Sequence, residues 1–355
     1  WAGAAPEPIE VAGVPLEFIL FALTLLGVAL FHHKTLQVAV TGLSVITVYK
    51  IVFTGFKAGE GLAGFGAHLG HHWVVIFNLL GLLLGFALLA RHFEESDIPK
   101  VLPRYLPDDW KGAFALLGIV FVLSSFLDNI AAALIGGAMA HTLFNKKVHI
   151  GYIAALVAAS NAGGSGSVVG DTTTTMMWIH GIPPTAVFHA YIAAGLALVV
   201  FGIPAALQQH KYSPILKDAS PNARIDWTRV GIVAFILVSA ISTNIFINVK
   251  YTEHADSFPF IGVAVCLAIL VSAPIRRPEW SLLPGAFKGA IFLLSLVLAA
   301  TMMPVEKLPA AAWQTAFGLG FLSAVFDNIP LTALALAQGG YDWGMLAYAV
   351  GFGGS

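Results

Sequence analysis

Charged residues are scarce in this chain, and cysteine is almost missing. Asp, Glu, Lys and Arg make up 10% of the 355 residues, against about 25% in a typical soluble domain, and 58% of the residues are hydrophobic. So few charges cannot cover a water-soluble protein of this size, and the composition indicates a polytopic membrane protein. The single cysteine, Cys266, excludes a disulfide framework and any multi-cysteine metal site, and its apolar neighbours predict a packing role.

The charge balance excludes one class of partner. The net charge is −1 at pH 7 and no long run of Lys and Arg is present, so we expect no nucleic acid partner. The chain starts at Trp1 and stops at Gly353-Gly354-Ser355, within what resembles a functional loop. We therefore expect both ends to be incomplete.

Several hydrophobic runs are long enough to cross a bilayer, for which a helix needs ~20 residues. Seven single crossings are predicted, at 15–31, 35–54, 73–90, 186–206, 229–249, 258–273 and 285–303.

Two further apolar regions are each divided by an Asp-Asn pair. Asp128-Asn129 divides region 113–144, and Asp327-Asn328 divides region 311–338. A carboxylate inside the bilayer costs roughly 2.5–3.5 kcal/mol on insertion scales, so it is seldom kept unless it faces a cavity or an ion. Each region therefore predicts a re-entrant helical hairpin with a functional tip.

Segment 150–180 is apolar at both ends and rich in glycine between Asn161 and Asp171. This composition predicts a helix that unwinds midway through the membrane. Non-helical backbone at that depth is tolerated only where protein or a water-filled cavity surrounds it. We therefore expect a binding site at the break, with free backbone carbonyls as ligands.

The positive residues favour one topology. Of the 18 Lys and Arg residues, fourteen fall on the cytoplasmic side if hairpin 113–144 enters from the cytoplasm and hairpin 311–338 enters from outside. The outer side then holds only Lys50, Lys57, Lys250 and Lys307.

The order of these segments predicts an inverted repeat. Residues 1–206 form the first repeat, 207–228 a cytoplasmic linker, and 229–355 a second repeat of opposite orientation that is incomplete at its C-terminal end. The predicted fold is an all-α polytopic membrane protein with two re-entrant hairpins and broken helices.

Inverted repeats with discontinuous helices are typical of secondary transporters, which bind substrate near the middle of the membrane. Carboxylate, amide, hydroxyl and carbonyl oxygens suit hard cations such as sodium. We hypothesise that Asp128, Asp171 and Asp327 alternately hold sodium and protons, because burial and a neighbouring carboxylate both favour protonation. The candidate ion-binding residues are Asp128, Asn129, Asn161, Gly163, Gly164, Asp171, Thr172, Thr173, Thr174, Asp327 and Asn328.

The segments SSFLDNIAAAL, SNAGGSGSVVGDTTTTMMW and FDNIPLTALAL resemble the NhaD-type sodium/proton antiporters of the ion transporter superfamily, which also includes arsenite, citrate and dicarboxylate carriers. This resemblance implies a scaffold with a transport domain, often dimeric, whose ions lie where hairpin tips meet broken helices. The chain departs from the antiporter pattern at Gly166 and Val168, where the family carries an aromatic residue and a proline. The transported ion is therefore left open.

Simpler structural roles remain open for several of these residues. Asn129 and Asn328 could cap the second arms of the hairpins, and Asp171 could cap the helix that follows it. Glu17 and Lys50 could form an ion relay, although we expect both side chains to reach the membrane interface.

The cluster His68-Leu-Gly-His71-His72 falls in a predicted outer loop, 55–72. Its spacing matches a histidine box of membrane di-iron enzymes, but no second or third box is present in the sequence. A solvated loop is the preferred interpretation, with pH sensing as an alternative.

The sequence thus predicts a sodium/proton antiporter, not an enzyme, in a bacterial inner membrane. The alternatives are sodium-coupled transport of citrate, a dicarboxylate or an oxyanion, a metalloenzyme that uses the histidine cluster, and an inert subunit of a membrane complex. We expect no cofactor besides transported sodium and protons, no metal beyond the transported sodium, and the lipid bilayer, small ions and a second copy of the chain as partners.

Overall fold

The computed structural model describes residues 9–101, 105–127, 129–215, 224–254 and 257–353. Its only sheet, within these residues, is a short antiparallel hairpin of β1 (Glu10–Val11) and β2 (Val14–Pro15). All other regular elements are helices, and the expected all-α fold is confirmed.

Among the described residues, five helical spans are long and apolar enough to cross a membrane. The chain is therefore a polytopic membrane protein. The spans are α2 (Thr35–Tyr49) with the π-helical η1 (Lys50–Thr54); α3 (Gly61–Glu94); α9 (Pro184–Phe188) with α10 (Ala190–Tyr212); α11 (Trp227–Lys250, the span ending at Ile247); and η4 (Trp280–Leu282) with α13 (Leu283–Thr301).

Two of the seven predicted crossings are shorter than expected. Helix α1 (Leu16–Leu30) has 15 residues and α12 (Phe260–Ser272) has 13, fewer than the ~20 that span the hydrocarbon core. Cys266 of α12 is exposed, so the predicted packing role is wrong. The short segments η3 (Thr252–His254), α4 (Ile98–Val101) and η5 (Val305–Lys307) lie in connections.

Both Asp-Asn regions form helical hairpins. The first consists of α5 (Trp110–Ser124) and α6 (Asn129–Leu143), and the second of α14 (Trp313–Ser323) and α15 (Asn328–Gln338). The first hairpin packs against α7 (Ile150–Ser165) and the second against α16 (Trp343–Gly353).

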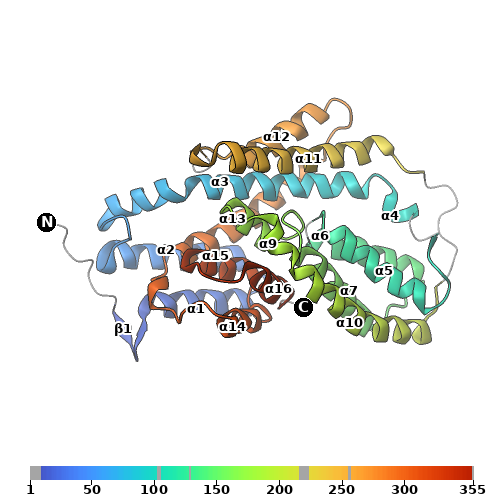
Figure 1. Cartoon of the computed structure of the whole chain (residues 1–355), viewed down its shortest axis with the longest axis horizontal. Coiled ribbons are helices and arrows are strands. Elements are labelled where there is room, and N and C mark those ends of the chain that lie inside the picture. The colour runs from blue at the N-terminus through green and yellow to red at the C-terminus, as the bar shows by residue number, and fades with distance from the viewer. Residues whose placement is uncertain (1–8, 102–104, 128, 216–223, 255–256, 354–355) are drawn as a thin grey trace.

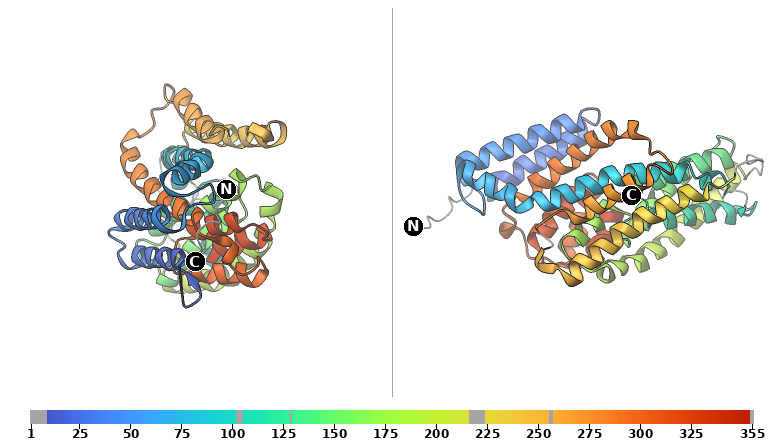
Figure 2. Two further views of the ribbon diagram at one scale, coloured as in Figure 1. Left: turned by 90° about the vertical axis from the view of Figure 1, so that its left-hand side faces the viewer. Right: turned by 90° about the horizontal axis from the view of Figure 1, so that it is seen from above.

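Helix α3 runs along the whole molecule and joins two hydrophobic cores (Figure 1). One core lies among α1, α2, α13, α15 and α16, on the left in Figure 1, and the other among α5, α6, α7 and α10, on the right. Phe86 of α3 and Ile179, which ends α8 (Thr172–Ile179), pack against both cores. Helices α11 and α12 cover the opposite side of α3 (Figure 2).

The expected outer loop 55–72 is mostly helical, because α3 begins at Gly61. Its first turn folds back on the preceding connection, where a Cβ on Gly64 would lie 2.1 Å from the Gly59 carbonyl oxygen. The prediction of a solvated histidine loop is therefore wrong, and His68 is buried within the molecule.

Glu17 and Lys50 are also placed differently from the expectation. These residues are 1% and 8% exposed, so neither side chain extends from the protein surface toward a membrane interface. The Lys50 ammonium lies 5.6 Å from the centre of the Phe56 ring, a cation–π contact that holds it inside.

Candidate functional site

The main chain leaves the helical conformation between α7 and α8, at residues 166–171. This break is shorter than predicted, because Asn161, Gly163 and Gly164 still belong to α7. The glycines allow close packing there: a Cβ on Gly163 would lie 2.0 Å from the Phe121 carbonyl oxygen of α5. These residues therefore bring the backbones of α5 and α7 together and do not offer unwound carbonyls.

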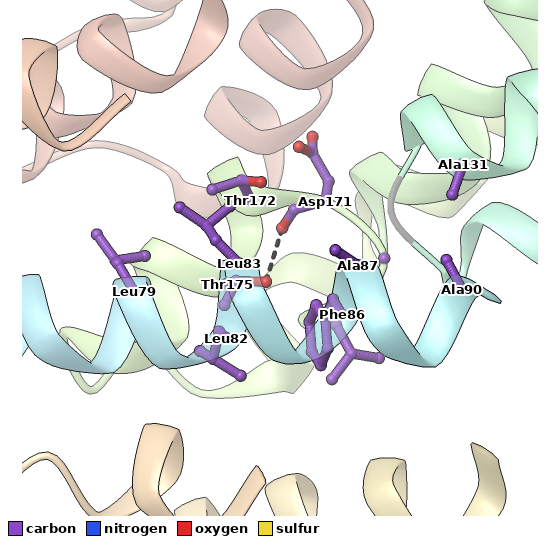
Figure 3. Close-up of a pocket in the computed structure, with 12 residues that line it drawn as sticks. Leu79, Leu82, Leu83, Phe86, Ala87, Ala90, Ala131, Asp171, Thr172 and Thr175 are labelled. Carbon is purple, nitrogen blue, oxygen red and sulfur yellow. Dashed lines mark hydrogen bonds between the residues drawn. The ribbon is translucent and has the colours of Figure 1, made fainter. Parts of the chain in front are cut away.

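Asp171 begins α8 as its N-cap, and its Oδ1 accepts the Thr173 N–H at 3.1 Å. The side chain is 2% exposed. In Figure 3 the carboxylate points away from the leucines of α3. It approaches α16, where a Cβ on Gly351 would lie 2.9 Å from Oδ2. The capping role and a buried position between two helices therefore occur together at this residue.

A small cavity of about 100 Å³ lies beside Asp171 (Figure 3). Its described lining contains no Lys, Arg or His. Asp171 is the only ionisable residue in this lining, next to the hydroxyl-bearing Thr172 and Thr175. The other lining residues are Leu79, Leu82, Leu83, Phe86, Ala87, Ala90, Ala131, Val169 and Gly170.

The threonines after Asp171 have different tasks. The Thr174 hydroxyl donates to the Ser167 carbonyl oxygen, and the Thr175 hydroxyl lies 3.0 Å from the Val168 carbonyl oxygen, so both fasten the break to α8. Thr173 is fully buried, and its hydroxyl has no hydrogen-bond partner among the described residues. The hydroxyl of Ser124, at the end of α5, is also buried and also has no hydrogen-bond partner among the described residues. Among the described residues, both hydroxyls therefore have unused hydrogen-bonding capacity beside the break.

The first hairpin is fastened to this break by its polar tip. The Asn129 side chain donates from Nδ2 to Oδ1 of Asn161 at 2.9 Å. The Ser125 hydroxyl lies 3.0 Å from the Gly163 carbonyl oxygen, and Ser167 donates to the Ser125 carbonyl oxygen at 2.5 Å. Asp128, the acidic residue predicted for this tip, lies outside the described residues.

The second hairpin brings Asp327 and Asn328 to the start of α15, where both are partly buried. Asp327 caps this helix through Oδ1, which accepts the Ile329 N–H at 2.9 Å. The alternative in which Asn328 is the cap is therefore wrong. Asp327 and Asn328 are connected to the break through the packing of α15 against α8 and α16.

Sequence reasoning missed the serines near the two hairpin tips, of which Ser125 and Ser323 hold the hairpins in place. Ser124 and Ser323 each stand four residues before the aspartate of their hairpin, so the duplicated sequence carried the signal. Ser323 of α14 donates to the Val350 carbonyl oxygen of α16 at 2.7 Å. Small hydroxyl residues thus anchor both hairpins to the helices that follow them.

Comparison with known proteins agrees with this arrangement. The profile of the family described as "Citrate transporter" (CitMHS) matches residues 11–353. The chain belongs to the citrate transporter family. The motif resemblance to sodium/proton antiporters of the ion transporter superfamily is also confirmed by two plant relatives.

These relatives are "Sodium/proton antiporter 1" and "Sodium/proton antiporter 2" of Arabidopsis thaliana. Each relative is 24% identical to this chain, and the aligned region covers 79% of this chain. The chain covers 54% of the first relative, about half its length, and 74% of the second. The family description and the names of both relatives are those of transporters, and the chain is an integral membrane protein.

Proposed function

We propose that the protein is a secondary transporter that exchanges sodium ions for protons across the membrane. The observation that carries this proposal is the Asp171 carboxylate, which is buried at the break between α7 and α8 beside a cavity whose described lining contains no basic residue. Burying a negative charge is costly, and a cation or a proton next to the carboxylate would offset that cost.

The surrounding oxygens suit a sodium ion. The Asp171 carboxylate supplies charge, and the Thr173 and Ser124 hydroxyls are buried without a partner among the described residues. Oxygen ligands of this kind match hard cations. When sodium leaves, a proton would take its place on the carboxylate, and this exchange would couple the two ions.

A second candidate is sodium-coupled transport of a carboxylate anion. The family description favours it, because the matching profile is that of a citrate transporter. The N-terminus of α8 would offer an anion the positive end of a helix dipole. The same purified protein distinguishes the two candidates.

The test is proton movement in proteoliposomes under imposed gradients of sodium, lithium, potassium or citrate. We expect sodium to drive proton flux, and Asp171→Asn to reduce that flux to background. Glu253→Gln, an exposed residue of η3, is the control and should behave as the native protein. Proton flux that persists in Asp171→Asn would refute the proposal, and sodium-dependent citrate uptake without proton exchange would establish the second candidate.

A matched pair of threonine variants tests ligation directly. Thr173→Val should weaken sodium affinity about tenfold, since a charge-assisted oxygen contact contributes roughly 1.5–3 kcal/mol. It should leave the melting temperature unchanged, because no hydrogen bond among the described residues is lost. Thr175→Val should lower the melting temperature and leave the sodium affinity unchanged, because the Thr175 hydroxyl fastens the break to α8.

A further inference from the structure

A second cavity, which the proposed exchange does not use, lies between α3, α8, α13 and α15. Its volume is about 640 Å³. Four histidines line it together with Lys57, and the described lining contains no Asp or Glu. Three of the histidines belong to α3 and the fourth follows α8: His68, His71, His72 and His180.

The histidines of α3 share one helix face, because residues three and four apart are neighbours on a helix. The ring centroids of His68 and His72 are 4.5 Å apart, and those of His71 and His72 are 5.0 Å apart. Nε2 of His68 lies 3.1 Å from the Thr301 hydroxyl of α13, and Nδ1 of His180 lies 2.8 Å from the Met176 carbonyl oxygen. The rings are therefore held in place around the cavity.

The charged groups around the cluster are mostly positive. Lys50 of η1 acts on His68 through space, and Lys57 lies in the connection that precedes α3. Two acids lie beside these lysines: Glu306 of η5 is 3.8 Å from the Lys57 ammonium at the exposed rim, and Glu17 of α1 is close enough for its charge to act on Lys50. The residues that α13 and α15 contribute to the described lining are not titratable.

Protonating a second imidazole in this cluster is opposed by its neighbours, unless negative charge enters at the same time. We propose that the cavity binds a small oxyanion with at least two negative charges, and that the histidines take up protons as it binds. This anion site is separate from Asp171. Its wall includes Met176 and Ile179 of α8, so a bound anion contacts the helix that Asp171 caps.

Isothermal titration calorimetry of the purified full chain tests this proposal, with citrate and sulfate as probes. Measurements at about pH 6 and about pH 8 should show affinity that rises as the pH falls, about tenfold per pH unit for each proton taken up. Titrations in two buffers of different ionisation heat should show net proton uptake. Binding of citrate alone would restrict the ligand to carboxylates, and binding of both would define an oxyanion site.

Variants locate the binding. The double variant His71→Gln/His72→Gln should lose at least tenfold in affinity at the lower pH and no longer take up protons, whereas the exposed His254→Gln should match the native protein. Lys57→Gln, a residue with 67% side-chain exposure, provides a second test that leaves the fold intact and should also weaken binding.

Asp171→Asn separates this site from the proposed exchange. It should lose sodium-driven proton flux and keep anion binding. The proposal is overturned if neither probe binds, if binding occurs without proton uptake, if both the histidine and lysine variants bind normally, or if Asp171→Asn abolishes binding.

Discussion

Gly163 faces the carbonyl oxygen of Phe121 with no room between them for a methyl group. A Cβ at this position would lie 2.0 Å from that oxygen, whereas a Cβ on Gly118 of α5 would have no atom within 4 Å. We predict that Gly163→Ala lowers the free energy of unfolding by about 1–3 kcal/mol through overpacking. Gly118→Ala should raise it by about 0.5–1 kcal/mol, since alanine favours helix. Thermal unfolding in detergent measures both, and equal melting temperatures would contradict the packing argument.

The sequence predicted which residues of the candidate site lie close together better than it predicted the role of each residue. Asn129 and Asn161 are hydrogen-bonded to each other, and Asp171 is buried at the break, as the motifs led us to expect. The role of Gly163 could not be predicted, because glycine both breaks helices and permits close packing, and only the position of α5 decides between these effects. Ligation of an ion by the predicted set stays a prediction.

At the scale of elements, the C-terminal end of α3 is joined to the rest of the molecule by ion pairs. Nε of Arg91 lies 2.5 Å from Oε2 of Glu279, just before η4. Nη1 of Arg229 in α11 lies 2.6 Å from Oε2 of Glu95, and Nε of Arg276 lies 3.1 Å from Oδ2 of Asp226. The first two pairs connect the end of α3 with the start of η4 and with α11, and the third joins the start of α11 to the segment after α12.

The Glu279 pair predicts a pH dependence of stability. The hydrogen bond from Arg91 lowers the pKa of the Glu279 carboxyl below its ordinary value of 4.5. The pair should therefore stabilise the fold fully above that value and lose its effect as the pH falls through the lowered pKa. Glu279→Gln should have a slightly lower melting temperature than the native protein at neutral pH, and the difference should vanish in acid. The exposed Glu253→Gln should show no such convergence, and a constant difference at all pH values would refute the assignment.

The helical hairpins could be predicted because an acid–amide pair within an apolar run is too costly in lipid to be kept without a polar tip that shelters it. The length of α3 could not, since residues 61–72 contain glycine and histidine, which are locally typical of a loop. Tertiary contacts overrode that preference: Phe65 and His68 pack on the Phe56 ring, with centroids 5.6 and 5.5 Å apart. Burial of Glu17 and Lys50 was missed for the same reason, because their covering groups come from other segments.

For the whole molecule, the predicted inverted topology remains to be tested. Lys57 lies beside Glu306, so the α2–α3 connection and η5 are at one end, and α5 starts near Lys111 at the opposite end in Figure 1. In a Cys266→Ser background, single cysteines at positions 57 and 307 should react with an impermeant maleimide added outside intact cells. Cysteines at positions 111 and 146 should react only after the cells are permeabilised. Reaction of all four from outside would contradict the topology.

The backbone contact between Gly163 and Phe121 has a consequence for any transport motion. Together with the serine hydrogen bonds of the tip, it joins the first hairpin to the broken helix, and we expect the two to move as one unit. The side of the Asp171 cavity that α3 supplies is hydrocarbon only, from Leu79 to Ala90. These lining residues of α3 offer no polar side chain that would have to be released, so we expect sliding of this unit along α3 to be a low-cost movement during transport.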